Sequence, residues 1–321
     1  MRRIVRSEAV CLRVRDYHES SKLVTFFTHE RGKVNCLAKG ARWLKSKFGA
    51  ALDLFAQSRI IYYWRETRDL YTLSDAELVH SFSGLALEPG KFLAAEQMSE
   101  FVLRVIQPLD PNPQLYQLLL NYLSTLESLQ NLEAEESRNQ GIKESSVRPG
   151  TRILESSTPR LLPVALVCSF LLKAASFLGF RPELRRCLIC RRPIENQRPA
   201  YFDAARGGIL CPRCAGERPE IQDPESEIQN PKWLAPADLD LLCFLLYTPA
   251  SEIAAVSAST PQALNLQTAT CKLQTGPLAP GPKPLAPGPS PLDLVLNFLA
   301  HHFDPLVLNS FRWQAGLEHK T

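Results

Sequence analysis

The sequence predicts an α+β protein of several domains, with a small closed β-barrel first and a mainly α-helical region interrupted by a four-cysteine metal module. Three observations support this fold class. Residues up to about 80 alternate between apolar and polar with a period of two, those after about 85 follow a helical period, and four cysteines form two closely spaced pairs. With 321 residues, 45% of them hydrophobic, the chain is long enough for two or three domains.

Five short strands are expected in the first 75 residues. The first strand is expected to turn Val10, Leu12 and Val14 to one face and Cys11, Arg13 and Arg15 to the other. The remaining strands are expected at residues 23–28, 33–38, 55–64 and 70–74. Polar turns join them, except for a basic loop at 39–49. Strands of this number and length suit a small closed barrel.

Two amphipathic helices are expected after residue 85, separated by prolines at positions 108, 111 and 113. The inward face of the first is expected to hold Phe92, Ala95, Ser99, Val102 and Ile106. That of the second is expected to hold Leu115, Leu118, Leu119, Tyr122, Leu126 and Leu129. Residues 133–158 have few apolar side chains and are expected to be an exposed or disordered connection.

The most apolar stretch, residues 161–180, approaches the length of a transmembrane helix. It contains Lys173 and Pro163, and a buried central helix that ends at Gly179 is the better interpretation. The first residues carry positive charge but lack the apolar run of a signal peptide. A cytoplasmic protein with no membrane partner is therefore expected.

The C-terminal third is expected to begin a helix near Pro236 and to end with an amphipathic helix at 291–303. Between them, Leu-Ala-Pro-Gly-Pro occurs twice, which indicates a Pro/Gly-rich spacer at 276–291 without regular structure. Four segments are expected: the barrel at 1–80, a helical domain at 81–183, the metal module at 184–216, and the rest of the helical domain at 217–321.

The two cysteine pairs predict one structural zinc ion per chain. Cys187 and Cys190 form one pair and Cys211 and Cys214 the other, with twenty residues between them. Each pair can form a tight knuckle, and two knuckles complete the closed tetrahedral shell that Zn²⁺ favours. Two disulfides, or four unrelated buried thiols, are the alternatives. The remaining cysteines have no paired spacing, and at least Cys11, Cys36, Cys168 and Cys243 are expected to be buried thiols.

Net charge is +4, but the positive charge is concentrated. Residues 1–50 hold twelve Lys/Arg against four Asp/Glu, and residues 181–218 hold nine against four. Such clusters suit a polyanion, although they can also simply solvate a surface. Trp43 and Phe48 lie among the cations of the 39–49 loop, where aromatic rings can either stack on unpaired bases or pack under the loop. The candidate DNA-binding residues are Arg13, Arg15, Arg31, Lys33, Lys39, Arg42, Trp43, Lys45 and Lys47.

The motifs of common enzyme classes are missing from the sequence. It contains no Gly-x-x-x-x-Gly-Lys-Ser/Thr phosphate loop, no His-Glu-x-x-His zinc helix and no Gly-x-Ser-x-Gly nucleophile turn. A zinc ion held by four thiolates has no open position for substrate. A binding protein with no catalytic residues is therefore expected.

Several segments in linear order resemble the RecO family of bacterial recombination mediators. They are the run Arg15 to Thr28, Gly32-Lys33, Ala38 to Arg42, Lys45 to Gly49, Leu178 to Pro182, and Gly207 to Cys211. The resemblance covers roughly residues 4–130 and 160–216. Residues 257–290 depart from it, and Arg191 stands where a small residue such as glycine often follows the second cysteine.

The resemblance implies an N-terminal OB-fold and a helical domain interrupted by a zinc module. It also implies binding of single-stranded and double-stranded DNA, annealing of complementary strands, and help in loading RecA onto DNA covered by single-stranded-DNA-binding protein, usually with RecR. The alternative is a zinc-ribbon adaptor whose barrel binds RNA or protein without annealing activity.

Overall fold

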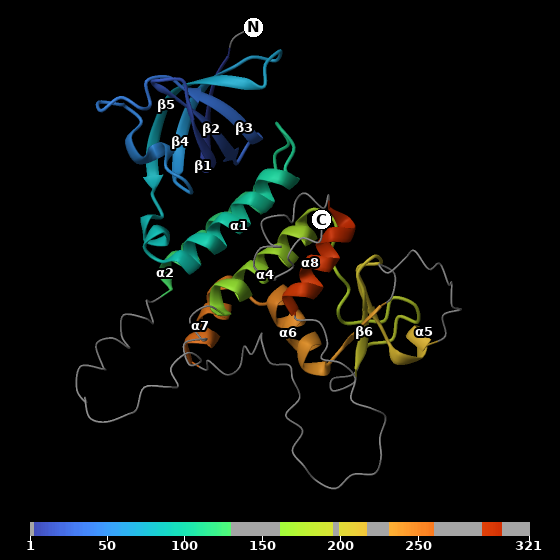
Figure 1. Cartoon of the computed structure of the whole chain (residues 1–321). Coiled ribbons are helices and arrows are strands. Elements are labelled where there is room, and N and C mark those ends of the chain that lie inside the picture. Colours follow the sequence, from blue (N-terminus) through green and yellow to red (C-terminus); the bar gives the residue numbers. More distant parts are fainter. Residues whose placement is uncertain (1–2, 130–160, 195–198, 217–230, 260–290, 304–321) are drawn as a thin grey trace, which may run out of the picture. The chain divides into compact units, whose positions relative to one another are not determined.

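The computed structural model describes residues 3–129, 161–194, 199–216, 231–259 and 291–303 (Figure 1). The chain divides into two compact units, residues 1–128 and 129–321. The expected boundaries near 80, 183 and 216 are finer than this division and stay predictions. The expected connection at 133–158 and, except for Pro291, the spacer at 276–291 lie outside the described residues.

The N-terminal unit begins with a five-stranded closed barrel in which the strands neighbour one another in the order β1-β2-β3-β5-β4. The strands are β1 (Arg3–Tyr17), β2 (Ser21–Thr28), β3 (Gly32–Ala38), β4 (Gln57–Trp64) and β5 (Leu70–His80). All pairs are antiparallel except β3 with β5, whose parallel pairing closes the barrel. A five-stranded barrel of this kind is an OB-fold, and the expected fold class is confirmed.

The barrel encloses a continuous apolar core. Aromatic side chains fill much of it, with Phe26, Tyr62 and Tyr71 all less than 5% exposed. The short 3-10 helix Gly49–Leu52 adds Ala51 and Leu52 to the same cluster, between β3 and β4. The connection after β3 therefore contributes to the core of the barrel.

The expected two faces of β1 were wrong because the strand contains a β-bulge. The register against β2 shifts between Cys11 and Arg13, so one extra residue separates the two halves of the strand. Cys11 consequently belongs to the barrel core, and Val14 packs against the same core. Arg13 and Arg15 lie outside it, as expected.

Two helices follow the barrel in the same unit, α1 (Pro89–Val105) and α2 (Pro113–Ser128). Their expected apolar faces are confirmed, with Val102 and Leu119 at 0% exposure, except that Phe92 and Leu129 are only partly buried. The α1 helix contacts β1, and Phe27 of β2 meets Tyr116 of α2 edge to face at 5.6 Å. The helices therefore cover part of the outer surface of the barrel.

The second unit is organised around α4 (Leu161–Phe177), which packs against α6 (Pro236–Tyr247), α7 (Ala250–Ser259) and α8 (Pro291–His302) (Figure 1). The end of α4 is set by Gly179, whose φ of 93° is readily available only to glycine. The amides of Gly179 and Phe180 donate to the carbonyls of Ser176 and Ala175, which is a Schellman motif. The expected stop at Gly179 is confirmed.

A small antiparallel sheet carries the four-cysteine region. Its strands are β6 (Ala200–Asp203), β7 (Gly208–Leu210) and β8 (Lys232–Leu234), in the order β7-β6-β8, with the five-residue helix α5 (Pro212–Gly216) after β7. Within the described part of the chain, no helix has both the length and the apolar character needed to cross a bilayer.

Candidate metal centre and nucleic-acid interface

The first cysteine pair lies on a tight backbone turn tied to the small sheet. The amide of Arg191 donates to the carbonyl of Cys187 at 2.9 Å, and the amide of Cys187 donates to the carbonyl of Arg192 at 2.9 Å. The amide of Leu188 donates to the carbonyl of Ile209 in β7, also at 2.9 Å. These bonds fix the first knuckle against the strand that leads to the second.

The second pair completes the cluster at the end of β7. Cys211 directly follows that strand, and Cys214 lies in α5. The four Sγ atoms all lie within 4.8 Å of one another, and Cys190 Sγ is 3.9 Å from Cys211 Sγ. Zn–S bonds of about 2.3 Å in a regular tetrahedron place sulfur atoms about 3.8 Å apart. The donor set therefore fits one tetrahedral metal ion.

The pKa values of these thiols are also consistent with binding of a metal cation. Burial of Cys187 opposes ionisation, but backbone hydrogen bonds outweigh it and lower the pKa of this thiol to about 6. One of these bonds comes from the amide of Cys211, at 3.4 Å. Hydrogen bonding to Cys211 is the main reason that the pKa of Cys214 is raised to about 12. Four crowded thiols thus resist joint deprotonation, and a divalent cation favours the thiolate form.

The other described cysteines are of a different kind. Cys11, Cys36 and Cys168 are fully buried, and burial raises the pKa of each thiol, that of Cys168 to about 12. Cys243 is half-buried and lies 3.6 Å from the carbonyl oxygen of Leu184. The first three are buried thiols as expected, whereas the expectation was wrong for Cys243, which is only partly buried. Cys271 lies outside the described residues.

Arg191 has a φ of 60°, in the left-handed region that favours glycine. We predict that Arg191→Gly strengthens metal retention. Left-handed backbone costs a non-glycine residue about 1–2 kcal/mol, and glycine removes this cost. The greater freedom of glycine in the unfolded chain offsets about 0.5–1 kcal/mol of the stabilisation. The chelator concentration that removes half of the zinc should then be roughly twofold to fivefold higher than for the parent protein.

The matched control is Arg192→Gly, because Arg192 is not among the residues with positive φ. It should weaken retention. If Arg191→Gly releases zinc at a lower chelator concentration than the parent protein, the strain argument is wrong.

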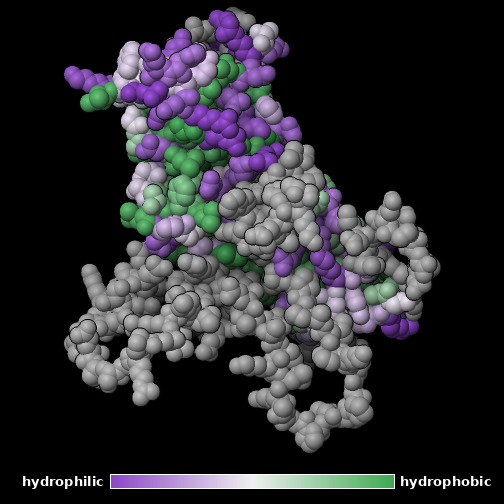
Figure 2. Space-filling view, viewed as in Figure 1, coloured by the Kyte–Doolittle hydropathy of each residue, from purple (hydrophilic) through white to green (hydrophobic). Residues whose placement is uncertain are grey.

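The second candidate site is the outer face of the barrel across β1, β2, β3 and β5. Strand register aligns one row of outward side chains over all four strands: Arg13, Thr25, Asn35 and Leu70. The Thr25 hydroxyl donates to Oδ1 of Asn35 at 2.9 Å. On the side turned to the viewer in Figure 2, hydrophilic residues cover much of the barrel, with hydrophobic residues between them.

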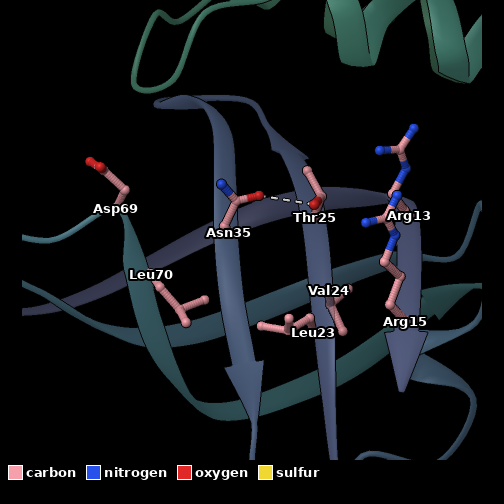
Figure 3. Close-up of a pocket in the computed structure, with 8 residues that line it drawn as sticks. All are labelled: Arg13, Arg15, Leu23, Val24, Thr25, Asn35, Asp69 and Leu70. Carbon is pink, nitrogen blue, oxygen red and sulfur yellow. Dashed lines mark hydrogen bonds between the residues drawn. The ribbon is translucent and has the colours of Figure 1, made fainter. Parts of the chain in front are cut away.

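The outer face across β1, β2, β3 and β5 contains a pocket of about 340 Å³, shown in Figure 3. Arg13 and Arg15 border one side and Asp69 and Leu70 the other. The remaining lining residues are Leu23, Val24, Thr25 and Asn35. OB-folds bind oligonucleotides on this strand 2–3 face, where cations can hold phosphate and apolar side chains can contact a base.

The basic loop after β3 is anchored at both ends. The amide of Arg42 donates to the carbonyl of Ser20 at 3.0 Å, and its guanidinium donates to the carbonyl of His18 at 2.8 Å and pairs with Asp16 at 3.4 Å. Lys47 donates to the carbonyl of Ser74. The loop therefore starts at the same end of the barrel as Arg15.

The structure separates the two aromatic residues of this loop. Phe48 is 4% exposed and belongs to the barrel core, so it packs under the loop. Trp43 is 68% exposed and is available for stacking. Lys39 and Lys45 are exposed, and among the described residues no acidic side chain lies within salt-bridge distance of either. Their side chains are available to an external anion.

Three other candidate residues have partners within the N-terminal unit. Arg13 pairs with Glu100 of α1 at 3.0 Å, and the Arg31 guanidinium lies 5.6 Å from the centre of the Trp64 ring. Lys33 donates from Nζ to the carbonyl of Leu103 at 2.8 Å, in the last turn of α1. Burial, followed by the charge of Arg13, lowers the pKa of the Lys33 amine.

We predict that Lys33→Ala destabilises the N-terminal unit by about 1–2 kcal/mol. The change removes a charge-assisted hydrogen bond and a cation from the negative end of a helix. Urea unfolding followed by circular dichroism measures the loss, and Lys45→Ala is the control with unchanged stability. In Lys33→Ala the salt dependence of DNA binding should not change, because Lys33 is held by α1. Wild-type stability with a weaker salt dependence would instead assign Lys33 to DNA.

The sequence analysis did not include Thr25, Asn35 and Leu70 among the candidate DNA-binding residues, although they line the pocket. The alternating pattern places these residues at outward positions of their strands. It does not tell which outward side chains become neighbours on adjacent strands, because that depends on strand register. The sequence analysis also missed Leu44, which is fully exposed in the middle of the basic loop.

Comparison with known proteins identifies relatives over most of the chain. Residues 1–82 match the family model "Recombination protein O N terminal", and residues 87–138 and 154–273 match "Recombination protein O C terminal". The DNA repair protein RecO of Anaeromyxobacter sp. (strain K) is 31% identical over 211 residues, which cover 66% of this chain and 70% of the relative.

Two further relatives have the same printed name, DNA repair protein RecO. That of Desulfatibacillum aliphaticivorans is 32% identical over 213 residues, covering 65% of this chain and 71% of the relative. That of Salinibacter ruber is 39% identical over 125 residues, covering 39% of this chain and 48% of the relative. Since the two family models together span both compact units, the chain belongs to the RecO family.

Proposed function

We propose that this chain is a DNA-binding recombination mediator in DNA repair. The observation that carries the proposal is the OB-fold face, where a pocket beside Arg15 lies at the same barrel end as a loop with exposed Lys39, Trp43 and Lys45. Relatives named as DNA repair proteins support the biological setting.

In this proposal the protein binds both single-stranded and double-stranded DNA. The cations of the loop neutralise backbone phosphates, which gives binding that is strong at low salt and independent of sequence. Trp43 and the pocket add contacts to unpaired bases. When two DNA strands are held by their phosphates and base faces, the base-pairing edges stay accessible. The same surface therefore promotes annealing without a chemical step.

We further propose that the protein acts with RecR to help RecA replace single-stranded-DNA-binding protein, in the cytoplasm and associated with the nucleoid. The family membership supports these partners. The four cysteines would hold one structural zinc ion, because four thiolates complete its shell and leave no position for a substrate.

Annealing of complementary strands covered by single-stranded-DNA-binding protein tests the proposal. We expect the purified protein to accelerate duplex formation well above the spontaneous rate, and increasing salt to suppress the effect. A fluorescence-transfer pair on the two strands measures the rate. Tight binding to RNA or to a protein, together with no acceleration, would favour an adaptor instead.

A further inference from the structure

The basic loop carries an unusually exposed apolar tip. Trp43 is 68% exposed and Leu44 is 107% exposed, the highest value among the large hydrophobic side chains of the described residues. Single exposed apolar residues are common on protein surfaces, but two adjacent ones at the tip of a charged loop call for a physical explanation.

The backbone holds this tip in a defined shape. The amide of Trp43 donates to the carbonyl of Gly40 at 3.2 Å, and the amide of Ser46 donates to the carbonyl of Trp43 at 2.9 Å. Phe48 is buried in the barrel core and anchors the C-terminal end of the loop. The tip is therefore presented outward by a short turn with both ends anchored.

Gly40 provides a seat for the indole ring. A Cβ atom at this position would lie 3.1 Å from Cε3 of Trp43 and 3.3 Å from Cζ3, and Gly40 also has a φ of 71°. One part of the ring thus rests on bare backbone. Because the side chain is still 68% exposed, the ring offers a preoriented surface to a stacking partner.

The charge around the tip identifies the partner. Residues 39–49 contain four cations and no acidic residue, and Lys39 and Lys45 lie on either side of the two apolar side chains in the sequence. An apolar contact surrounded by positive charge is complementary to unpaired bases flanked by phosphates. Proteins that distort DNA use leucine and similar side chains as wedges between base steps.

We propose that Trp43 and Leu44 form a two-residue wedge, in which Trp43 stacks on one unpaired base and Leu44 inserts between that base and its neighbour. This inference rests on the proposed DNA binding and deepens it. The bases are then separated individually while Lys39 and Lys45 hold the backbone. The wedge consequently favours single strands over fully stacked duplex.

A cycle between protein variants and base removal tests the wedge. The probes are a short single-stranded oligonucleotide and a sugar-phosphate strand of equal length without bases. The parent protein should bind the first roughly fivefold to a hundredfold more tightly, the range expected for stacking on one aromatic side chain. Leu44→Ala and Trp43→Ala should each lower this ratio, and Trp43→Phe should largely preserve it.

The matched control is Leu87→Ala, because Leu87 is 78% exposed and lies outside the loop. It should leave the ratio unchanged, and the slope of log affinity against log salt should stay constant in all these variants. Circular dichroism should also stay constant, since the tip residues are exposed.

The wedge is wrong if Leu44→Ala and Trp43→Ala keep the parent ratio. It is also wrong if the parent binds both strands equally with normal salt dependence, although DNA binding itself then stands. Failure to bind either strand overturns the proposed function as well. If these two variants keep the ratio but lose binding to anionic lipid vesicles, the tip contacts a membrane surface instead.

Discussion

Replacing Cys190 with serine is expected to abolish zinc binding and to loosen the four-cysteine region while the barrel stays folded. Serine is a poor zinc ligand, and the remaining three thiolates cannot complete the closed shell. Structural zinc in small modules contributes about 10–16 kcal/mol of apparent binding free energy, which is available for folding. This is the largest effect that we expect from any single substitution in the chain.

The location of the effect follows from the knuckle contacts. Because Leu188 is hydrogen bonded to Ile209 and Cys187 to Cys211, loss of the metal removes support from β7 and from the residue that follows it. Hydrogen exchange should therefore accelerate in residues 181–194 and 199–216. Residues 3–128 should keep their protection, since they form a separate compact unit.

Two measurements check this prediction. Elemental analysis should give one zinc per parent chain and almost none for Cys190→Ser, and exchange followed by mass spectrometry locates the loosened segments. Cys243→Ser is the control, because this thiol lies outside the cluster. Metal-replete parent protein that contains no zinc and whose four cysteines are all alkylated freely would contradict the metal centre itself.

Replacing Lys39, Arg42, Lys45 and Lys47 together with alanine is expected to remove most of the salt-sensitive DNA affinity. Each phosphate contact on a single strand contributes about 0.7 to the slope of log affinity against log salt, so the slope should fall by up to roughly 3. Affinity should decrease for every sequence alike, because phosphate contacts contain no base information. Annealing should weaken in parallel.

The structure ranks these four cations. Lys39 and Lys45 are exposed and have no acidic partner among the described residues, whereas Arg42 pairs with Asp16. Lys45→Ala alone should therefore lower the slope by about 0.7. Arg59→Ala is the matched control, because Arg59 is exposed but lies 3.9 Å from Glu8 and 3.6 Å from Glu77, and it should leave the slope unchanged.

A folded quadruple variant that keeps both affinity and slope would place the DNA surface elsewhere. The next candidate is the basic four-cysteine region, with Arg185, Arg186, Arg191 and Arg192. Arg185 is the least available of these, because its guanidinium lies 4.0 Å from the centre of the Tyr247 ring.

Local patterns were sufficient where the structure depends on residues close in sequence. Helical faces such as those of α1 and α2 follow from the spacing of apolar side chains, and Gly179 marks the end of α4 through its left-handed φ. The four cysteines were recognisable because a tetrahedral shell constrains the spacing within each pair. The exposed cations of the 39–49 loop were also identifiable as a group.

Tertiary structure decided the features that depend on pairing between distant segments. The bulge in β1 turned Cys11 into the barrel, although strict alternation placed it with Arg13. Trp43 and Phe48 are both aromatic residues of one loop, yet only contact with the barrel core shows that Phe48 is buried. Lys33 reaches the end of α1, seventy residues away.

The sequence by itself determined the fold class, the cysteine cluster and the position of the basic loop, because each can be recognised from a short residue spacing or from local composition. The tertiary structure decided which side chains of those segments are exposed and which are buried or partnered. It also aligned Arg13, Thr25, Asn35 and Leu70 across four strands. The reason is that strand register and burial arise from contacts between residues far apart in the chain, and local periodicity does not record those contacts.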